Sequence, residues 1–373
     1  MAEYYTQGIR RTKRRRSTKR RSGKEWLLLL LDIAVAVAMA VLLFATVTTV
    51  VVHYISPAKT GVLSVLALGA PVVYLLDVVV LLYWVARWRW RFVAVALVSV
   101  VVGLFYVPRY YRADIMREYE TKYVERNFTK VMTYNVREGR NEGLVDTIFK
   151  IKPDILCLQE IATTTENWQR LAERYNTTYH DGDGSSNEIL SRYRILRSGP
   201  IDTLPRSRAM WADLRIDKDT VRAVSLHLRS TAIRKEDTQF LENHEYILDG
   251  ERKTKLHSIV SRLVENNRHR AVQAQSVAKF VASTSYPVIL CGDFNDVPLS
   301  YTYYIIRRGL NDTFSEMADG YAYTYDTTYG LLRIDNIFVS PSIEVISYEV
   351  FGDVAFSDHY PVVARLKITD KNR

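Results

Sequence analysis

The first third of the chain contains three apolar segments, at residues 26–55, 61–86 and 92–107. A helix needs about 20 apolar residues to cross a bilayer, so the first two segments are long enough and the third is near the lower limit of about 17. A cleaved signal peptide fits poorly, because the first segment is too long for one and two more follow it. We therefore expect three transmembrane helices in residues 25–108, with the lipid bilayer as their partner.

Two carboxylates, Asp32 and Asp77, lie inside these apolar segments. A charge within a bilayer is costly and often marks a functional site. Asp32, however, lies near the end of its segment. Packing between the helices therefore explains both residues better than a functional role does.

Basic residues flank the segments unevenly, and this predicts an orientation. Residues 1–24 hold ten Lys or Arg and one Glu, a charge of +9, and the turn at residues 87–91 holds three Arg. The loop between the first two segments holds only Lys59. Because basic loops stay in the cytoplasm, residues 1–24 form a cytoplasmic tail of an inner- or plasma-membrane protein, and residues 108–373 lie outside the cytoplasm. A nucleic-acid-binding arm is the weaker interpretation, because the tail continues directly into an apolar segment.

The composition changes abruptly near residue 108, and we expect a connector at residues 109–128 and a soluble domain at residues 129–373. The tail accounts for most of the net charge of +10, so the soluble domain has a charge near −1. A domain that grips duplex nucleic acid through many phosphates carries a basic excess, which this one lacks. Local basic patches near Arg229 and at Arg268 and Arg270 are explained equally well by solvated helix faces.

Short β-rich runs alternate with helical stretches from residue 129 onward. The expected helices are 141–150, 166–175 and 251–283. The expected strands are 131–136, 153–160, 187–192, 208–216, 221–227, 287–293, 333–340, 343–351 and 360–367. Residues 230–250 show no periodicity and are expected to form a loop beside the active site. Cys157 and Cys291 lie within two strands, so we expect buried, reduced thiols.

Polar side chains stand at the ends of several expected strands. They are Asn135, Glu160, His227, Asp293, Asn295, Asp335, Asp358 and His359. A single polar residue at a strand end is more often a solvated terminus or a helix cap than a metal ligand, but chance does not readily explain the whole set. A metal-assisted hydrolase needs a hard cation held by oxygen ligands, a base that orients water, and a donor over the phosphoryl oxygens. The set contains a candidate for each.

At these positions, roughly residues 129–370 resemble the endonuclease/exonuclease/phosphatase superfamily, the DNase I-like fold, and most of all its bacterial membrane-anchored members. The resemblance implies an α/β fold, a four-layer αββα sandwich, preceded here by the N-terminal transmembrane helical region. It places the active site at one end of the sandwich. The combined motifs are specific for the superfamily and say little about the substrate.

The resemblance also implies ligands for a metal ion. Asn135 matches the residue that helps to position metal and phosphate, and Glu160 matches the principal metal-binding carboxylate. Asp358, in the Asp-His pair that closes the site, completes the predicted metal set. A hard divalent ion, Mg²⁺ or Mn²⁺, fits oxygen donors of this kind, and zinc fits less well because no thiolate is near.

The remaining residues match groups that act on the substrate. Asp293 and Asn295 match the pair that orients the attacking water and contacts the phosphate. Asp335 matches the carboxylate that fixes His359, which would stay protonated and stabilise charge on the phosphoryl oxygens. His227 matches the histidine of the DNase I, sphingomyelinase and inositol-phosphatase branches.

Three further features leave alternatives open. Asn336 follows Asp335 where the family commonly has an aromatic residue or histidine, which affects substrate contacts. The tyrosine-rich stretch at residues 321–329 has three possible roles: stacking on a base or sugar, entering the bilayer interface, or packing. An Asp-His pair can also serve a serine nucleophile, here Ser357 or Ser340, but no nucleophile-elbow motif is present.

The resulting hypothesis is a membrane-anchored, metal-dependent phosphoesterase that hydrolyses a phosphodiester, in nucleic acid or phospholipid, by attack of water. The alternatives are a phosphatase of a small phosphorylated molecule or inositol phosphate, and a catalytically idle binding or scaffold domain. We predict no protein partner and no organic cofactor.

The topology can be tested with reporter fusions at residue 373. We expect a reporter that works only in the periplasm to be active there, because three spans follow a cytoplasmic N-terminus. Activity of a cytoplasm-only reporter at the same position would contradict this orientation.

Overall fold

The protein is described here from a computed structural model of the whole chain. The residues that it describes are 22–112, 128–178, 185–201, 203–205, 207–231, 237, 240, 250–326 and 332–368. The basic tail, most of the connector, most of the expected loop at residues 230–250 and the end of the tyrosine-rich stretch lie outside them. Their predicted structures stay predictions.

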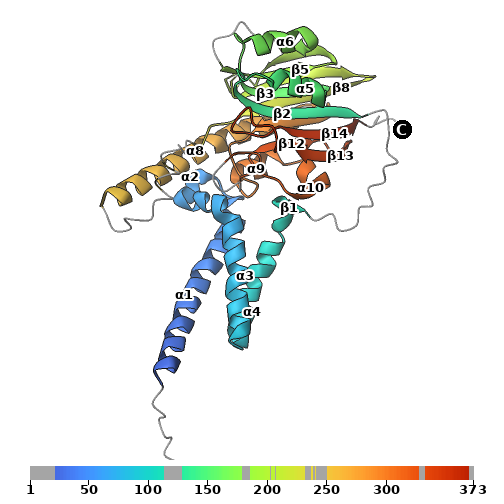
Figure 1. Cartoon of the computed structure of the whole chain (residues 1–373). Helices are drawn as coiled ribbons and strands as arrows, with labels where there is room; N and C mark the ends of the chain where they lie inside the picture. Colours follow the sequence, from blue (N-terminus) through green and yellow to red (C-terminus); the bar gives the residue numbers. More distant parts are fainter. Residues whose placement is uncertain are drawn as a thin grey trace, which may run out of the picture.

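The N-terminal region is helical and projects from the rest of the molecule as a bundle (Figure 1). Three helical stretches are long and apolar enough to cross a membrane, Gly23–Val52, Pro57–Ala86 and Trp90–Arg109. The second is composite, because it contains a short helix, a 3₁₀ segment and a longer helix. The elements are α1 (Gly23–Val52), α2 (Pro57–Thr60), η1 (Gly61–Gly69), α3 (Ala70–Ala86), α4 (Trp90–Leu104) and η2 (Val107–Arg109).

Both carboxylates of this region join helices. Asp32 on α1 accepts hydrogen bonds from the Tyr83 hydroxyl at 2.7 Å and from Arg87 Nε at 2.9 Å. Asp77 on α3 accepts a hydrogen bond from Thr46 Oγ1 on α1 at 2.5 Å. The prediction of a helix-packing role is confirmed for these two residues.

The soluble domain contains two six-stranded sheets. The first has the order β13-β14-β2-β3-β5-β4, with the bounds Ile343–Val350, Val362–Ile368, Thr129–Glu138, Ile155–Ala162, Ser185–Ser191 and Asn176–Thr177. The second has the order β10-β12-β9-β8-β7-β6, with the bounds Asn311–Asp312, Asp335–Val339, Val288–Asp293, Asp219–His227, Ala209–Ile216 and Arg194–Pro200. A separate pair joins β1 (Tyr111–Arg112) to β11 (Gly320–Tyr321).

The sheets pack face to face, with helices on their outer faces (Figure 1). Apolar side chains of both sheets form the central core, which includes Cys157 and Cys291 as buried free thiols, as predicted. Helices α5 (Leu144–Ile151) and α6 (Glu166–Arg174) cover the first sheet. Helices α8 (Gly250–Ala282) and α9 (Tyr301–Ile306) cover the second. The four-layer αββα sandwich is therefore confirmed.

Chain direction brings six strand ends to one edge of the sandwich. Within each sheet, one central pair is parallel, β2 with β3 and β8 with β9. Strands β14 and β12 run antiparallel to β2 and β9. The carboxyl ends of four strands therefore meet the amino ends of two others, and these are the ends to which the sequence assigns the polar residues.

A glycine allows strands β8 and β9 to approach closely at this edge. Gly292 has φ +137°, and a Cβ atom there would overlap the Leu226 backbone of the neighbouring strand. Such a conformation is nearly restricted to glycine. Glycine is thus required at position 292 by the close approach of the two strands, and not by a role in the chemistry of the site.

We expect Gly292→Ala to lower the free energy of unfolding by about 3 kcal/mol or more, because steric overlap adds to backbone strain. Gly352→Ala is the matched control, since a Cβ atom there meets nothing within 4 Å. It should change stability by less than about 0.5 kcal/mol. Urea denaturation of the full chain in detergent, followed by tryptophan fluorescence, measures both, and equal stability of the two variants would contradict the packing argument.

Candidate active site

Three candidate residues form one row across the second sheet. Asp293 at the end of β9 is the register partner of His227 on β8 and of Asp335 on β12. Side chains alternate between the faces of a strand, and Cys291, two residues before Asp293, belongs to the core between the sheets. The row therefore points into the space between the sheets.

Glu160 reaches this space through a bulge. Leu158 and Ile161 are three positions apart, yet both pack on the outer face of the first sheet. Strict alternation allows only one residue between two side chains on the same face, so strand β3 contains one extra residue here. That residue, Glu160, has φ +57°. Its Oε1 lies 3.2 Å from Asn135 Nδ2 and 3.3 Å from His227 Nε2. Strict alternation would have directed Glu160 to the outer face, so the bulge is what brings it into the site.

Asp293 lies at the centre of the cluster and is 1% exposed. Its Oδ2 accepts hydrogen bonds from Asn135 Nδ2 at 3.2 Å and from Asn295 Nδ2 at 2.9 Å, and its Oδ1 accepts one from the Asn295 backbone at 2.8 Å. Asn295 adopts φ +52°, which folds its side chain back onto the carboxylate. His227 Nε2 and His359 Nε2 lie 3.9 and 3.7 Å from the same Oδ2.

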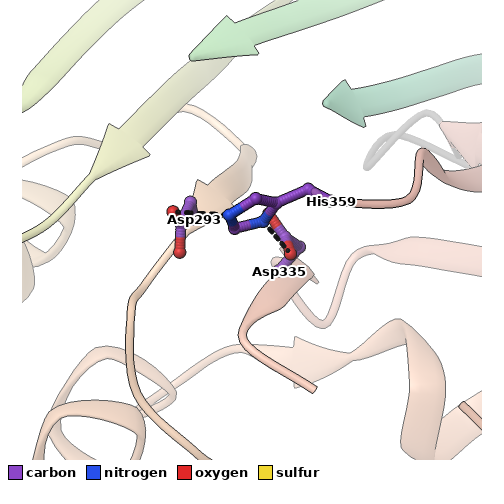
Figure 2. A group of neighbouring side chains, drawn as sticks. All are labelled: Asp293, Asp335 and His359. Carbon is purple, nitrogen blue, oxygen red and sulfur yellow. Dashed lines mark hydrogen bonds and ion pairs between the residues drawn. The ribbon is translucent and has the colours of Figure 1, made fainter. Parts of the chain in front are cut away.

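His359 lies between two carboxylates (Figure 2). Its Nδ1 is 2.9 Å from Asp335 Oδ2, and its Nε2 is directed toward Asp293. Asp335 is held by a hydrogen bond from its backbone to Thr324 Oγ1 at 3.0 Å. Its buried Oδ1 has no partner among the described residues. The predicted fixing of His359 by Asp335 is present in the structure.

The surroundings shift three pKa values. Burial disfavours the imidazolium of His359, but Asp335 and Asp293 attract it more strongly, so the pKa of His359 rises to about 10. Burial raises the pKa of Asp335 to about 6. The hydrogen bond from His227 lowers the pKa of Glu160 to about 2, against the effect of burial. At neutral pH the site thus holds an ionised Glu160 and a protonated His359 paired with an ionised Asp335.

Asp358 lies at the rim of the site. Its Oδ2 is 3.7 Å from Arg137, and its Oδ1 accepts a hydrogen bond from Ser357 Oγ at 3.2 Å. Its side chain is 35% exposed, in contrast to the buried Asp293 and Asp335. The predicted role of Asp358 as a metal ligand stays a prediction.

Neither serine is placed to act as a nucleophile activated by His359. Ser340 follows the far end of β12 from Asp335, and its Oγ accepts a hydrogen bond from the Val288 backbone at 2.8 Å. Ser357 is bonded to Asp358, as described above, and His359 Nε2 is directed toward Asp293. The described geometry therefore gives no support to a serine nucleophile activated by His359.

Asn336 is a structural residue. It is fully buried, and its Oδ1 accepts a hydrogen bond from Arg333 at 2.7 Å. Because it follows Asp335 on β12, its side chain points to the opposite face of the sheet from the site. The departure from the family pattern therefore does not affect a substrate contact.

One residue that supports the site was misinterpreted from the sequence. Arg270 does not belong to a solvated helix face, because it is completely buried. It donates hydrogen bonds to Asp296 Oδ2 at 3.2 Å and to the Arg229 carbonyl at 2.8 Å. It thereby joins the loops that follow His227 and Asn295. The signal was present in the spacing, since position 270 continues the inward-facing series 263, 267, 274 and 277 of α8.

A second missed feature is a buried polar network beneath the site. Gln159 on β3 donates a hydrogen bond to Ser225 Oγ on β8 at 3.1 Å. Asn187 on β5 donates one to the Ser225 carbonyl at 2.9 Å. These bonds cross from one sheet to the other and hold the two halves of the site in register.

The donor set fits a hard divalent cation. It contains carboxylates and an amide, and the only described thiols are buried in the core. Ligand-type atoms of Asp293, Asp335 and His359 lie within 4.8 Å of one another. This group differs from the predicted ligands Asn135 and Glu160, which approach Asp293 from the first sheet. A His359 that carries a proton on both nitrogens offers no lone pair to a metal ion. This favours Asn135 and Glu160 over the group that contains His359 as candidate metal ligands.

The sequence profile of the Endonuclease/Exonuclease/phosphatase family matches residues 132–359. The chain belongs to the endonuclease/exonuclease/phosphatase family. Members of this superfamily hydrolyse phosphodiester or phosphate-ester bonds, generally with divalent metal ions. A second profile, described as a domain of unknown function, matches residues 28–110.

Individual relatives are distant. The uncharacterized protein YbhP of Escherichia coli (strain K12) is 24% identical over 235 residues, which is 56% of this chain and 84% of that protein. The structure of D. rerio TDP2 complexed with single strand DNA product is 18% identical with a TM-score of 0.47, covering 64% of this chain and 99% of that one. The human Nocturnin catalytic domain with bound sulfate is 19% identical with a TM-score of 0.45, covering 66% and 95%.

Asp335→Asn is expected to lower the pKa of His359 from about 10 toward its ordinary value, because the carboxylate that attracts the imidazolium is removed while burial remains. NMR titration of labelled histidine side chains in the metal-free full chain measures this. Asp146→Asn, at an exposed carboxylate on α5, should leave the titration unchanged. A pKa that stays near 10 in the Asp335 variant would show that another group retains the proton.

Proposed function

We propose that the protein is a membrane-anchored, divalent-metal-dependent hydrolase that splits a phosphodiester by direct attack of water. One observation above all supports this. Polar residues from both sheets, far apart in the sequence, converge on the buried carboxylate of Asp293. A catalytically idle scaffold would not need to maintain a buried carboxylate flanked by two histidines.

Glu160 is the principal metal ligand in this proposal, and Asn135 and Asp358 complete the set. Glu160 suits the role because its low pKa keeps it ionised and its side chain is 37% exposed. Mg²⁺ fits these donors best, and Mn²⁺ is the alternative. A bound ion would neutralise charge on the phosphoryl group and orient it.

Asp293 acts as the general base. A buried carboxylate can accept a proton from water as the water attacks phosphorus, provided that donors keep it in place. Asn135 and Asn295 supply those donors at 3.2 and 2.9 Å. The Asn295 amide also donates to the Leu228 carbonyl at 3.2 Å, and its predicted contact with the phosphate stays a prediction.

His359 stabilises the negative charge that develops on the phosphoryl oxygens. Its raised pKa keeps the ring protonated, and Asp335 orients it through Nδ1, which leaves the Nε2–H directed into the site. His227 borders the opposite side of Asp293 and holds Glu160 ionised. The two histidines therefore have different roles.

The anchor is the set of three apolar helical stretches. In this proposal the N-terminus is cytoplasmic and the hydrolase domain faces the periplasm or the cell exterior. The turn between α3 and α4 supports this orientation. Its side chains Arg87 and Arg89 contact Asp32, near the N-terminal end of α1 that follows the basic tail, so both basic segments lie at the same end of the helices.

The activity is tested with the full chain in nanodiscs and a water-soluble diester, bis(p-nitrophenyl) phosphate. Turnover should require Mg²⁺ or Mn²⁺ and disappear with chelator. Asp293→Ala and His359→Ala should each lower kcat by on the order of 10²-fold or more, the usual effect of removing a general base or a charge-stabilising donor.

Asp146→Ala and His257→Ala, at exposed positions on α5 and α8, are the matched controls and should leave kcat unchanged. Metal-independent turnover, or full activity of the Asp293 variant, would contradict the assigned roles.

A further inference from the structure

The soluble domain packs directly against the ends of the membrane-side helices (Figure 1). A single apolar cluster, called here the junction cluster, contains side chains of both regions. Its buried members are Val52, Ala67, Ala70, Tyr74, Tyr110, Val297, Leu299 and Ile334. The first four belong to the helical region, and the last three belong to the soluble domain.

Polar contacts attach the two regions further. Strand β1, which follows the third apolar stretch, pairs with β11 of the soluble domain. The buried Arg333 donates a hydrogen bond to the Arg109 carbonyl at 3.0 Å. Asn267 on α8 donates one to Ser64 on η1 at 2.9 Å. The soluble domain is therefore held at the helix ends in one position, which a flexible tether alone would not achieve.

The segments that form this junction are also those that carry the candidate active site. Ile334 immediately precedes Asp335, and Val297 follows Asn295 by two residues. Tyr325 packs against the junction cluster, and its ring centroid lies 4.8 Å from that of His359. One side chain thus separates His359 from a cluster that includes the ends of membrane-side helices.

A row of tyrosines extends from the end of the third apolar stretch toward the site. Tyr111 is the register partner of Tyr321. The ring centroids of Tyr321 and Tyr323 are 6.5 Å apart, and those of Tyr323 and Tyr360 are 5.6 Å apart. Tyr360 adjoins His359 in the chain. Tyr111 and Tyr323 are 49% and 39% exposed. We call Tyr111, Tyr321, Tyr323 and Tyr360 the tyrosine rim.

Tyrosine is the side chain expected where protein meets the surface of a bilayer, because its ring is apolar and its hydroxyl is polar. The third apolar stretch, which precedes the rim in the chain, has exposed apolar side chains, and Phe105 near its end is 75% exposed. With the three apolar stretches in a bilayer, as proposed above, its surface lies at the level of the rim. The rim ends at Tyr360, the residue after His359.

We infer that the substrate is a phosphodiester in the headgroup of a bilayer lipid, which reaches the site along the tyrosine rim. This inference rests on the proposed function. Water forms the new bond to phosphorus, one P–O ester bond breaks, and a proton of the water passes through Asp293 to the departing oxygen. The products are a phosphomonoester and an alcohol, one of which remains in the membrane.

The charge of the domain agrees with a lipid substrate. A soluble polynucleotide must be captured from water, usually by a basic surface, and residues 129–373 have a net charge near −1. A lipid is already concentrated in the same bilayer as the enzyme. Capture by charge is then unnecessary.

The test uses the full chain reconstituted in vesicles of phosphatidylethanolamine and phosphatidylglycerol, with ³¹P NMR to follow release of the new phosphomonoester. Tyr111→Ser combined with Tyr323→Ser should lower lipid turnover by about tenfold or more, equivalent to about 1.4 kcal/mol of binding. Turnover of bis(p-nitrophenyl) phosphate should stay within about twofold, since neither residue contacts the reacting atoms.

Tyr323→Phe should retain lipid turnover because the ring is kept. Tyr286→Ser is the matched control, since Tyr286 is a similarly exposed tyrosine that precedes the opposite end of β9. It should leave both activities unchanged.

Three results would overturn the inference. Hydrolysis of a single-stranded oligonucleotide but of neither lipid would make nucleic acid the substrate class. An equal loss of soluble and lipid turnover in the double variant would make the rim a structural element only. A wild-type protein that hydrolyses neither the lipids nor the soluble diester would contradict the proposed function as well as the lipid inference. The soluble diester thus distinguishes failure of the lipid inference from failure of the proposed function.

Discussion

The buried carboxylate of Asp293 is the group on which the rest of the site depends. A charge that is almost completely removed from water costs several kcal/mol unless donors and opposite charges surround it. Here those groups come from β2, from the loop after β9 and from the segment before β14. The carboxylate is therefore stable only when both sheets and their connecting loops are in place, which links the chemistry of the site to correct assembly of the sandwich.

Buried polar side chains beneath the site support this arrangement of donors around Asp293. Arg270 fixes the loops that follow β8 and β9, and the hydrogen bonds around Ser225 hold the two sheets in register. Buried polar groups of this kind are stabilising only when their partners are present, so they favour a single arrangement. The same region of α8 contacts the helical region through Asn267. The positions of the candidate site and of the N-terminal helices are thus set together.

Much of the fold followed from local pattern. Alternation, helical spacing and strand-ending polar residues predicted the long strands and α5, α6 and α8 to within a few residues. Strand β6 was missed because Gly199 and Pro200 end it and much of it is exposed at an edge, so it lacks alternation. The candidate site residues were predicted because their motifs resemble a known family. The solvated-face interpretation of Arg270 was wrong, because one charged residue on an apolar stripe is ambiguous without knowledge of what covers it.

The sequence by itself determined the three apolar stretches and the α/β class, because each depends on composition or spacing along the chain. It also named the candidate site residues, through the resemblance of their motifs to a known family. Tertiary structure alone decided how those side chains meet. The bulge that turns Glu160 inward, the register that aligns His227, Asp293 and Asp335, and the contact of the helix ends with Val297 and Ile334 all depend on residues distant in sequence. No local pattern encodes such contacts, because their energy comes from packing between elements and appears only when the sheets and helices assemble.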